Sequence, residues 1–148
     1  QFMDIIGDAF RWKGENVSTN EVGEIINRTP EIEFANVYGV EIPGTEGKAG
    51  MAAVVLKKGL VESDIVLSKL FANANENLPV YARPVFVRIL KDLPTTSTHK
   101  MQKNKLKQEA FNIYEISETV IVKKPGQHEY SRLDSDFYSM IMEGKAGF

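Results

Sequence analysis

An apolar run beside a glycine-rich loop constrains the fold of this chain more than any other feature. Residues 51–56 read Met-Ala-Ala-Val-Val-Leu, an almost wholly apolar strand pattern. Residues 34–42 contain β-branched side chains that favour a second strand. Between these runs, residues 43–50 include one proline and three glycines, which are typical of a loop. We therefore predict a β-hairpin over residues 34–56 with a mobile loop. Gly47-Lys48 lacks the spacing and the following hydroxyl residue of a phosphate-binding loop.

Helix and strand signals on both sides of this hairpin indicate the fold class. Ser18 and Glu21 form the S-x-x-E pattern of a helix N-terminus, and Pro30 ends that helix. Asp134 predicts the start of a last helix. The order of elements indicates an α+β fold, with a small mixed sheet and flanking helices. The remaining predicted elements are a strand within 2–12, a helix from 62 to 78, a strand over 85–90, a lysine-rich helix over 101–110, and a late hairpin of 120–123 with 129–133. Phe137, Met140 and Ile141 are expected to dock the last helix.

Composition narrows the classes of function. The chain has 148 residues, of which 43% are hydrophobic, enough for one domain with a core. Its formal net charge of −2 and the absence of aromatics among its lysines argue against a nucleic-acid partner. With two histidines and no cysteine, we predict no metal site. No apolar run is long enough to span a membrane. The chain begins with Gln1, and we expect it to be part of a longer protein.

The most suggestive stretch for chemistry is Asp92-Leu-Pro-Thr-Thr-Ser-Thr-His-Lys-Met-Gln-Lys-Asn-Lys-Leu106. Pro94 interrupts regular structure, and four consecutive hydroxyl residues follow it. Lys100 stands at the start of the next predicted helix, from where it could stabilise negative charge on a phosphate or carboxylate. The alternative is an ordinary surface lysine, since lysine is mostly exposed in proteins. A partner surface would have to supply the rest of the site.

A second candidate is the turn at residues 13–16, Lys-Gly-Glu-Asn. Glycine and asparagine both tolerate a positive φ, which is what a tight turn requires. Taken alone, Gly14 is better explained as a simple turn glycine.

Four segments together resemble the C-terminal domain of adenylate-forming acyl-CoA synthetases. They are Gly-Asp-Ala-Phe-Arg-Trp-Lys-Gly-Glu-Asn-Val-Ser-Thr-Asn-Glu-Val at 7–22, Pro-Gly-Thr-Glu-Gly-Lys-Ala-Gly-Met at 43–51, Leu-Pro-Val-Tyr-Ala-Arg-Pro at 78–84 and Leu-Pro-Thr-Thr-Ser-Thr-His-Lys at 93–100. More narrowly, they resemble the very-long-chain acyl-CoA synthetase or fatty acid transport protein branch. The resemblance covers nearly the whole chain and is weaker after Phe111.

This resemblance implies a role for each candidate residue. Residues 9–148 would be a mobile lid, and residues 1–8 the end of a preceding N-terminal domain, with a hinge at Gly7 and Asp8. Lys100 would neutralise charge while acyl-AMP forms from a fatty acid and ATP. After the lid rotates, Lys13, Gly14, Glu15 and Asn16 would face the site and let CoA reach the adenylate. ATP and Mg²⁺ would be bound mainly by the N-terminal domain.

The resemblance also implies a setting. The parent protein would be an intracellular ligase associated with the endoplasmic reticulum, a peroxisome or the plasma membrane, and the isolated chain would be inactive. Two positions depart from the family pattern, which often has arginine where this chain has Ile5 and usually has glycine where it has His99. They keep an alternative open: a non-catalytic interaction or membrane-recruiting module of the same fold.

Overall fold

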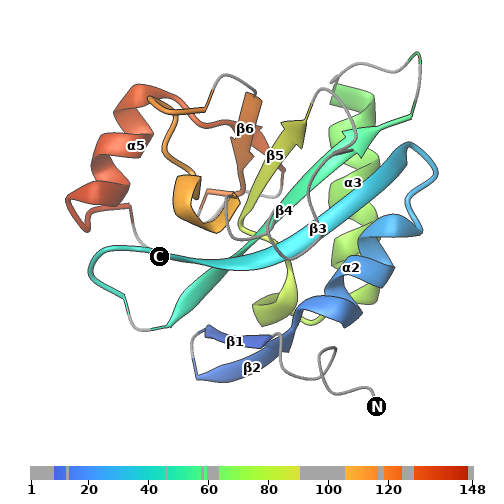
Figure 1. Ribbon diagram of the computed structural model, residues 1–148, viewed down its shortest axis with the longest axis horizontal. Coiled ribbons are helices and arrows are strands. Elements are labelled where there is room, and N and C mark those ends of the chain that lie inside the picture. Colours follow the sequence, from blue (N-terminus) through green and yellow to red (C-terminus); the bar gives the residue numbers. More distant parts are fainter. Residues whose placement is uncertain are drawn as a thin grey trace.

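A five-stranded mixed sheet forms the centre of the computed structural model (Figure 1), with strands in the order β3-β4-β5-β6-β7. A separate two-stranded hairpin pairs β1 with β2. The structure describes residues 9–12, 14–45, 47–57, 59, 64–90, 106–116, 119–124 and 129–146. The elements are β1 (Ala9–Trp12), β2 (Glu15–Ser18), α2 (Thr19–Asn27), β3 (Ile32–Glu41), β4 (Lys48–Leu56), α3 (Asp64–Asn77), η1 (Val80–Ala82), β5 (Phe86–Leu90), β6 (Thr119–Val122), β7 (Ser131–Arg132) and α5 (Ser135–Met142).

The central hairpin is formed as predicted. β3 and β4 pair antiparallel from Ile32↔Leu56 to Glu41↔Lys48. The connecting loop is shorter than predicted, because β4 begins at Lys48 rather than at Met51. Residues 49–55 are all buried, which requires cover on both faces of β4. The apolar sequence of this strand is therefore explained by its central place in the sheet.

The sheet is mixed because α3 connects two parallel strands. β4 and β5 run parallel, from Met51↔Phe86 to Val55↔Leu90, whereas β5–β6 and β6–β7 are antiparallel. Parallel neighbours need a crossover connection, which here includes α3 and η1. The predicted fold class, an α+β domain with a small mixed sheet and flanking helices, is confirmed.

Two helices pack together beside the sheet (Figure 1). α2 begins at its predicted capping residue, since the Ser18 side chain accepts a hydrogen bond from the Glu21 backbone N–H. The Asn73 side chain of α3 donates hydrogen bonds to Ile25 O at 2.6 Å and to Thr29 Oγ1 at 2.8 Å. These bonds satisfy acceptors at the end of α2 and fix the two helices to each other.

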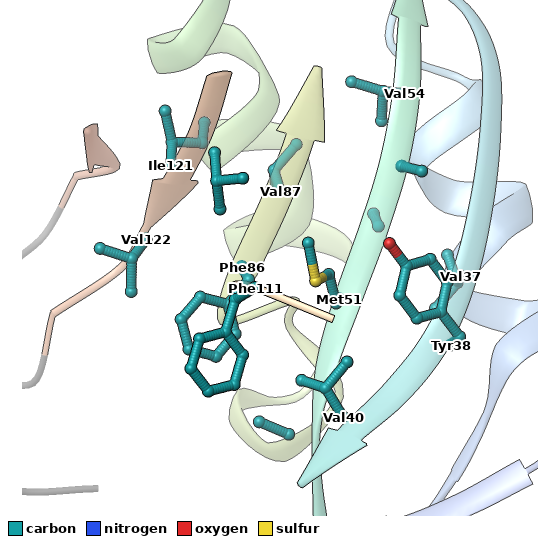
Figure 2. Close-up of a cluster of buried hydrophobic side chains, with 14 of the residues drawn as sticks. Val37, Tyr38, Val40, Met51, Val54, Phe86, Val87, Phe111, Ile121 and Val122 are labelled. Carbon is teal, nitrogen blue, oxygen red and sulfur yellow. The ribbon is translucent and has the colours of Figure 1, made fainter. Parts of the chain in front are cut away.

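Residues 106–116 and α5 lie on the other side of the molecule from α2 and α3 (Figure 1). The ring of Phe111 stacks on Phe86 of β5, with centroids 4.4 Å apart (Figure 2). α5 is capped as predicted, because Asp134 Oδ1 accepts a hydrogen bond from Phe137 N at 2.8 Å. Phe137 and Ile141 are buried, but Met140 is 42% exposed, so the prediction that Met140 docks this helix is wrong.

Candidate functional site

The candidate CoA-facing turn lies at the tip of the β1–β2 hairpin. Trp12 pairs with Glu15, so two residues connect the strands, and Gly14 is the second of them. Gly14 has a φ of +86°, in the left-handed region that favours glycine. A Cβ atom built on Gly14 would meet nothing within 4 Å. The α-carbon of this residue therefore faces open space.

One arginine braces this turn. Arg11 Nη2 donates a hydrogen bond to Gly14 O at 2.8 Å, and Arg11 Nη1 donates one to Asn16 Oδ1 at 3.2 Å. Arg11 and Asn16 are also paired across the two strands. Glu15 and Asn16 are exposed, so the turn presents polar groups around a glycine. These bonds tie Gly14 and Asn16 to Arg11 of the neighbouring strand.

Aromatic residues anchor the hairpin to the sheet. Gly39 and Gly50 are paired across β3 and β4. A Cβ on Gly39 would come within 2.8 Å of Phe10 Cγ, and a Cβ on Gly50 within 3.3 Å of Phe10 Cζ. The Phe10 ring therefore packs over two glycines, where larger residues would exclude it. Trp12, only 4% exposed, forms a β-bridge with Gly47.

This anchoring corrects one sequence-based expectation. A mobile loop is predicted over residues 43–50, but residues 48–50 belong to β4 and Gly47 forms a β-bridge with Trp12 of β1, so the predicted bounds are wrong and the mobility stays a prediction. Gly47 and Gly50 serve as docking positions for the hairpin that carries Gly14. The sequence offers only a weak signal for this contact, because the residues involved are far apart along the chain.

The other candidate residues lie outside the described part of the chain. These are the hinge residues Gly7 and Asp8, the turn residue Lys13, and the loop residue Lys100. The predicted lysine-rich helix lies partly outside it as well, and residues 106–109 are helical. The structure thus places Gly14, Glu15 and Asn16 together, and the roles of the remaining residues stay predictions.

An ion pair connects the two chain segments that flank Lys100. Arg88 Nη1 lies 2.6 Å from Glu109 Oε1, and the two residues are 21 positions apart. The Arg88 side chain is 8% exposed and that of Glu109 is 22% exposed. Sequence reasoning missed this pair. The signal was a single arginine in the otherwise apolar strand 85–90, because a buried charge requires a partner.

A pocket of about 720 Å³ lies beside this region. Its walls come from the β3–β4 turn, residues 107–112 and α5, and include Glu41, Thr45, Lys48 and Tyr138. Gly14 is not among the lining residues.

Within the described ranges, no group of three His, Cys, Asp or Glu residues is placed to hold a metal ion. Likewise, none of the helices among those residues is long and apolar enough to cross a membrane.

These features define a small α+β domain that presents an exposed glycine turn on an anchored hairpin. Residues 21–100 match the AMP-binding enzyme C-terminal domain family. The chain therefore belongs to this family. The resemblance derived from the sequence is confirmed.

The most similar relatives include fatty acid transport proteins. The chain is 42% identical over 141 residues to the mouse (Mus musculus) long-chain fatty acid transport protein 6, covering 95% of this chain and 22% of that protein. It is 42% identical over 144 residues to the human (Homo sapiens) long-chain fatty acid transport protein 3, covering 97% of this chain and 21% of that protein. The chain thus spans about a fifth of the length of these relatives.

Solved structures of adenylate-forming ligases share the fold. An anthranilate CoA ligase in complex with anthranoyl-AMP matches with a TM-score of 0.63 and 24% identity, over 74% of this chain and 21% of that one. A double mutant of the o-succinylbenzoate CoA synthetase from Bacillus subtilis, bound with its product analogue, matches with a TM-score of 0.55 and 27% identity. That match covers 70% of this chain and 20% of the other. In both cases the chain corresponds to a minor part of a larger protein.

Proposed function

We propose that this chain is the C-terminal lid domain of a long-chain or very-long-chain fatty acid–CoA ligase. The parent enzyme would join a fatty acid to ATP, giving acyl-AMP and pyrophosphate. It would then transfer the acyl group from AMP to the thiol of CoA, giving acyl-CoA. Family membership and the similarity to fatty acid transport proteins along nearly the whole chain support this proposal.

The observation that supports the proposed second half-reaction is the open space at the α-carbon of Gly14. A Cβ atom at this position would have no other part of the described structure within 4 Å, its chain neighbours aside. Because glycine leaves this space empty, an extended ligand such as the pantetheine arm of CoA could pass close to the backbone. The Arg11 hydrogen bonds and the packing of Phe10 hold the turn in place, so its geometry is set before any ligand arrives.

In this proposal, Lys100 is the catalytic residue of the first half-reaction. Its cationic side chain would offset the negative charge that develops between the carboxylate and the α-phosphate as acyl-AMP forms. Rotation about Gly7 and Asp8 would exchange the Lys100 segment for the Gly14 turn. Lid movements of this kind exclude water and order the steps of a reaction. We assign ATP and its Mg²⁺ mainly to the N-terminal adenylation domain of the parent, which is also the lid's partner.

The parent protein would act at a membrane, because its substrate and product are long-chain lipids. The endoplasmic reticulum, the peroxisome and the plasma membrane are all candidates. The alternative function, a non-catalytic interaction or membrane-recruiting module, is favoured by the departures Ile5 and His99.

Deleting residues 9–148 from the parent distinguishes the ligase lid from the non-catalytic module. We expect the truncated parent to lose fatty-acid-dependent acyl-CoA formation, and the isolated chain to show no fatty-acid-dependent ATP consumption. The measurements are pyrophosphate release and thioester formation, with the intact parent as the control. A truncated parent that still forms acyl-CoA at the intact rate would support the module. ATP consumption by the isolated chain would contradict the assignment as a lid.

A further inference from the structure

Gly47 contacts the β1–β2 hairpin at the end that carries the Gly14 turn. The hairpin is a separate sheet that lies beside the five-stranded sheet (Figure 1). Trp12 is the last residue of β1, and it forms a β-bridge with Gly47, which lies in the turn between β3 and β4. Trp12 also pairs with Glu15, the first residue of β2. The bridge therefore joins the β3–β4 turn to the base of the Gly14 turn.

The backbone of β1 leaves no room for a side chain at Gly47. A Cβ atom on Gly47 would collide with the backbone oxygen of Arg11 and would lie only 3.0 Å from the carbonyl carbon of Arg11. These are main-chain atoms, so they cannot turn aside as the far end of a flexible side chain could. A larger residue at position 47 would therefore displace the β1 strand itself.

Such a displacement would reach the Gly14 turn through Arg11. Arg11 Nη2 donates a hydrogen bond to Gly14 O at 2.8 Å, and Arg11 Nη1 donates one to Asn16 Oδ1 at 3.2 Å. The residue whose main chain contacts Gly47 is thus the residue whose side chain holds the turn. Gly47 limits where the Arg11 backbone can lie, and the Arg11 guanidinium group transmits this limit to Gly14 and Asn16.

We propose that Gly47 is a positioning residue for the thioester-forming half-reaction. Because it has no side chain, β1 can lie against the β3–β4 turn, and this contact sets where the Gly14 turn stands relative to the rest of the domain. Groups that orient a reaction lose up to roughly a hundredfold of their effect when they are misplaced by about 1 Å. The inference rests on the proposed function, because it assumes that CoA passes the Gly14 turn.

The same β3–β4 turn contains a matched control. Gly44 has a φ of +84° and Gly47 a φ of +80°, so an alanine at either position has the same kind of backbone strain. The nearest described atom to a Cβ on Gly44 would be Gly144 Cα at 3.7 Å, which is an ordinary contact outside the hairpin. Gly44→Ala therefore reproduces the backbone strain without the collision with β1.

The test compares Gly47→Ala with Gly44→Ala in the full-length parent protein. Gly47→Ala should slow thioester formation from supplied acyl-AMP and CoA by about tenfold or more. Fatty-acid-dependent ATP–pyrophosphate exchange should stay within about twofold of the wild type, because the proposed function assigns the Gly14 turn to the second half-reaction only. Gly44→Ala should leave both rates unchanged.

Gly50→Ala gives a milder displacement of the same strand. A Cβ atom on Gly50 would lie 3.3 Å from Phe10 Cζ, so the Phe10 ring has to move by only a few tenths of an ångström. We expect thioester formation to slow by about threefold and exchange to stay unchanged. If Gly47→Ala does not fold, this variant decides the question by the same comparison.

Gly14→Leu distinguishes this inference from the proposed function. If Gly14→Leu keeps thioester formation, the role assigned to the Gly14 turn is wrong and the inference falls with it. If Gly14→Leu loses thioester formation while Gly47→Ala keeps it, the positioning role alone is wrong. Equal losses of both partial reactions in Gly47→Ala, or equal slowing of thioester formation in Gly44→Ala and Gly47→Ala, would also overturn the positioning role.

Discussion

Two glycines with the same backbone conformation have different structural roles. Gly14 has a φ of +86° and Gly47 a φ of +80°, so both positions disfavour residues with a side chain. They differ in their surroundings. A Cβ on Gly14 meets nothing, whereas a Cβ on Gly47 would collide with the backbone oxygen of Arg11. Comparing them separates the cost of backbone conformation from the cost of a steric clash.

Alanine substitutions in the isolated chain should show this difference. Gly14→Ala should reduce the free energy of unfolding by about 1–2 kcal/mol, the cost of a left-handed residue with a Cβ atom. Gly47→Ala should cost about 2 kcal/mol more, because the β1 strand must also move. Urea unfolding of the two variants measures both effects. Equal destabilisation would show that the contact between Gly47 and β1 does not matter for stability.

At the scale of elements, a lysine–glutamate pair connects α3 to the turn before β3. Lys69 Nζ donates a hydrogen bond to Glu31 Oε2 at 2.9 Å. This hydrogen bond is the main cause that lowers the pKa of Glu31 below its ordinary value of 4.5, and partial desolvation opposes it. Because the pKa of Glu31 is lower in the folded state than in the unfolded state, ionised Glu31 stabilises the fold. This stabilisation is present above about pH 4.5 and is lost as the pH falls through the folded-state pKa.

Removing the lysine should reverse this pKa shift. We expect Lys69→Met to raise the pKa of Glu31, because the carboxylate loses its strongest partner. Lys57→Met is the control, since Lys57 lowers this pKa only through a weaker electrostatic effect. A titration of the Glu31 carboxyl group by NMR gives both values. Equal pKa changes in the two variants would contradict the role assigned to the Lys69 hydrogen bond.

Elements with local signals could be predicted from the sequence, and contacts between distant residues could not. The caps Ser18 and Asp134 and the β3–β4 hairpin follow from neighbouring residues, and the structure contains all three. The parallel pairing of β4 with β5, the Arg88–Glu109 pair and the docking of Phe10 depend on residues far apart in sequence. In α5, only Phe137 and Ile141 are buried, so its apolar stripe is narrower than the sequence suggests.

The candidate site likewise has features that the sequence could predict and features that it could not. The turn containing Gly14 could be predicted from residue types that tolerate a positive φ. The hydrogen bonds of Arg11 and the open space at the Gly14 α-carbon could not be predicted from the sequence, because both depend on where the strands pair. Lys100, Lys13, Gly7 and Asp8 lie outside the described residues, so their roles remain predictions from the family resemblance.

At the scale of the whole molecule, the domain combines a buried core with an exposed turn. Its core is closed, with β4 buried on both faces and a continuous apolar cluster across the sheet (Figure 2). The Gly14 turn lies at an exposed tip outside that core, and its neighbours Glu15 and Asn16 are exposed. A site of this kind needs a second surface to enclose a substrate. This is consistent with our proposal that catalysis belongs to the parent protein rather than to this chain alone.

We propose that one lid uses two faces for two half-reactions, and crossed variants of the parent test this. Lys100→Ala, Gly14→Leu and the control Lys103→Ala would be compared in ATP–pyrophosphate exchange and in thioester formation from supplied acyl-AMP and CoA. We expect Lys100→Ala to lose only exchange, Gly14→Leu to lose only thioester formation, and Lys103→Ala to keep both. If Lys100→Ala and Gly14→Leu impair the same partial reaction, or neither impairs any, the two-faced lid is contradicted.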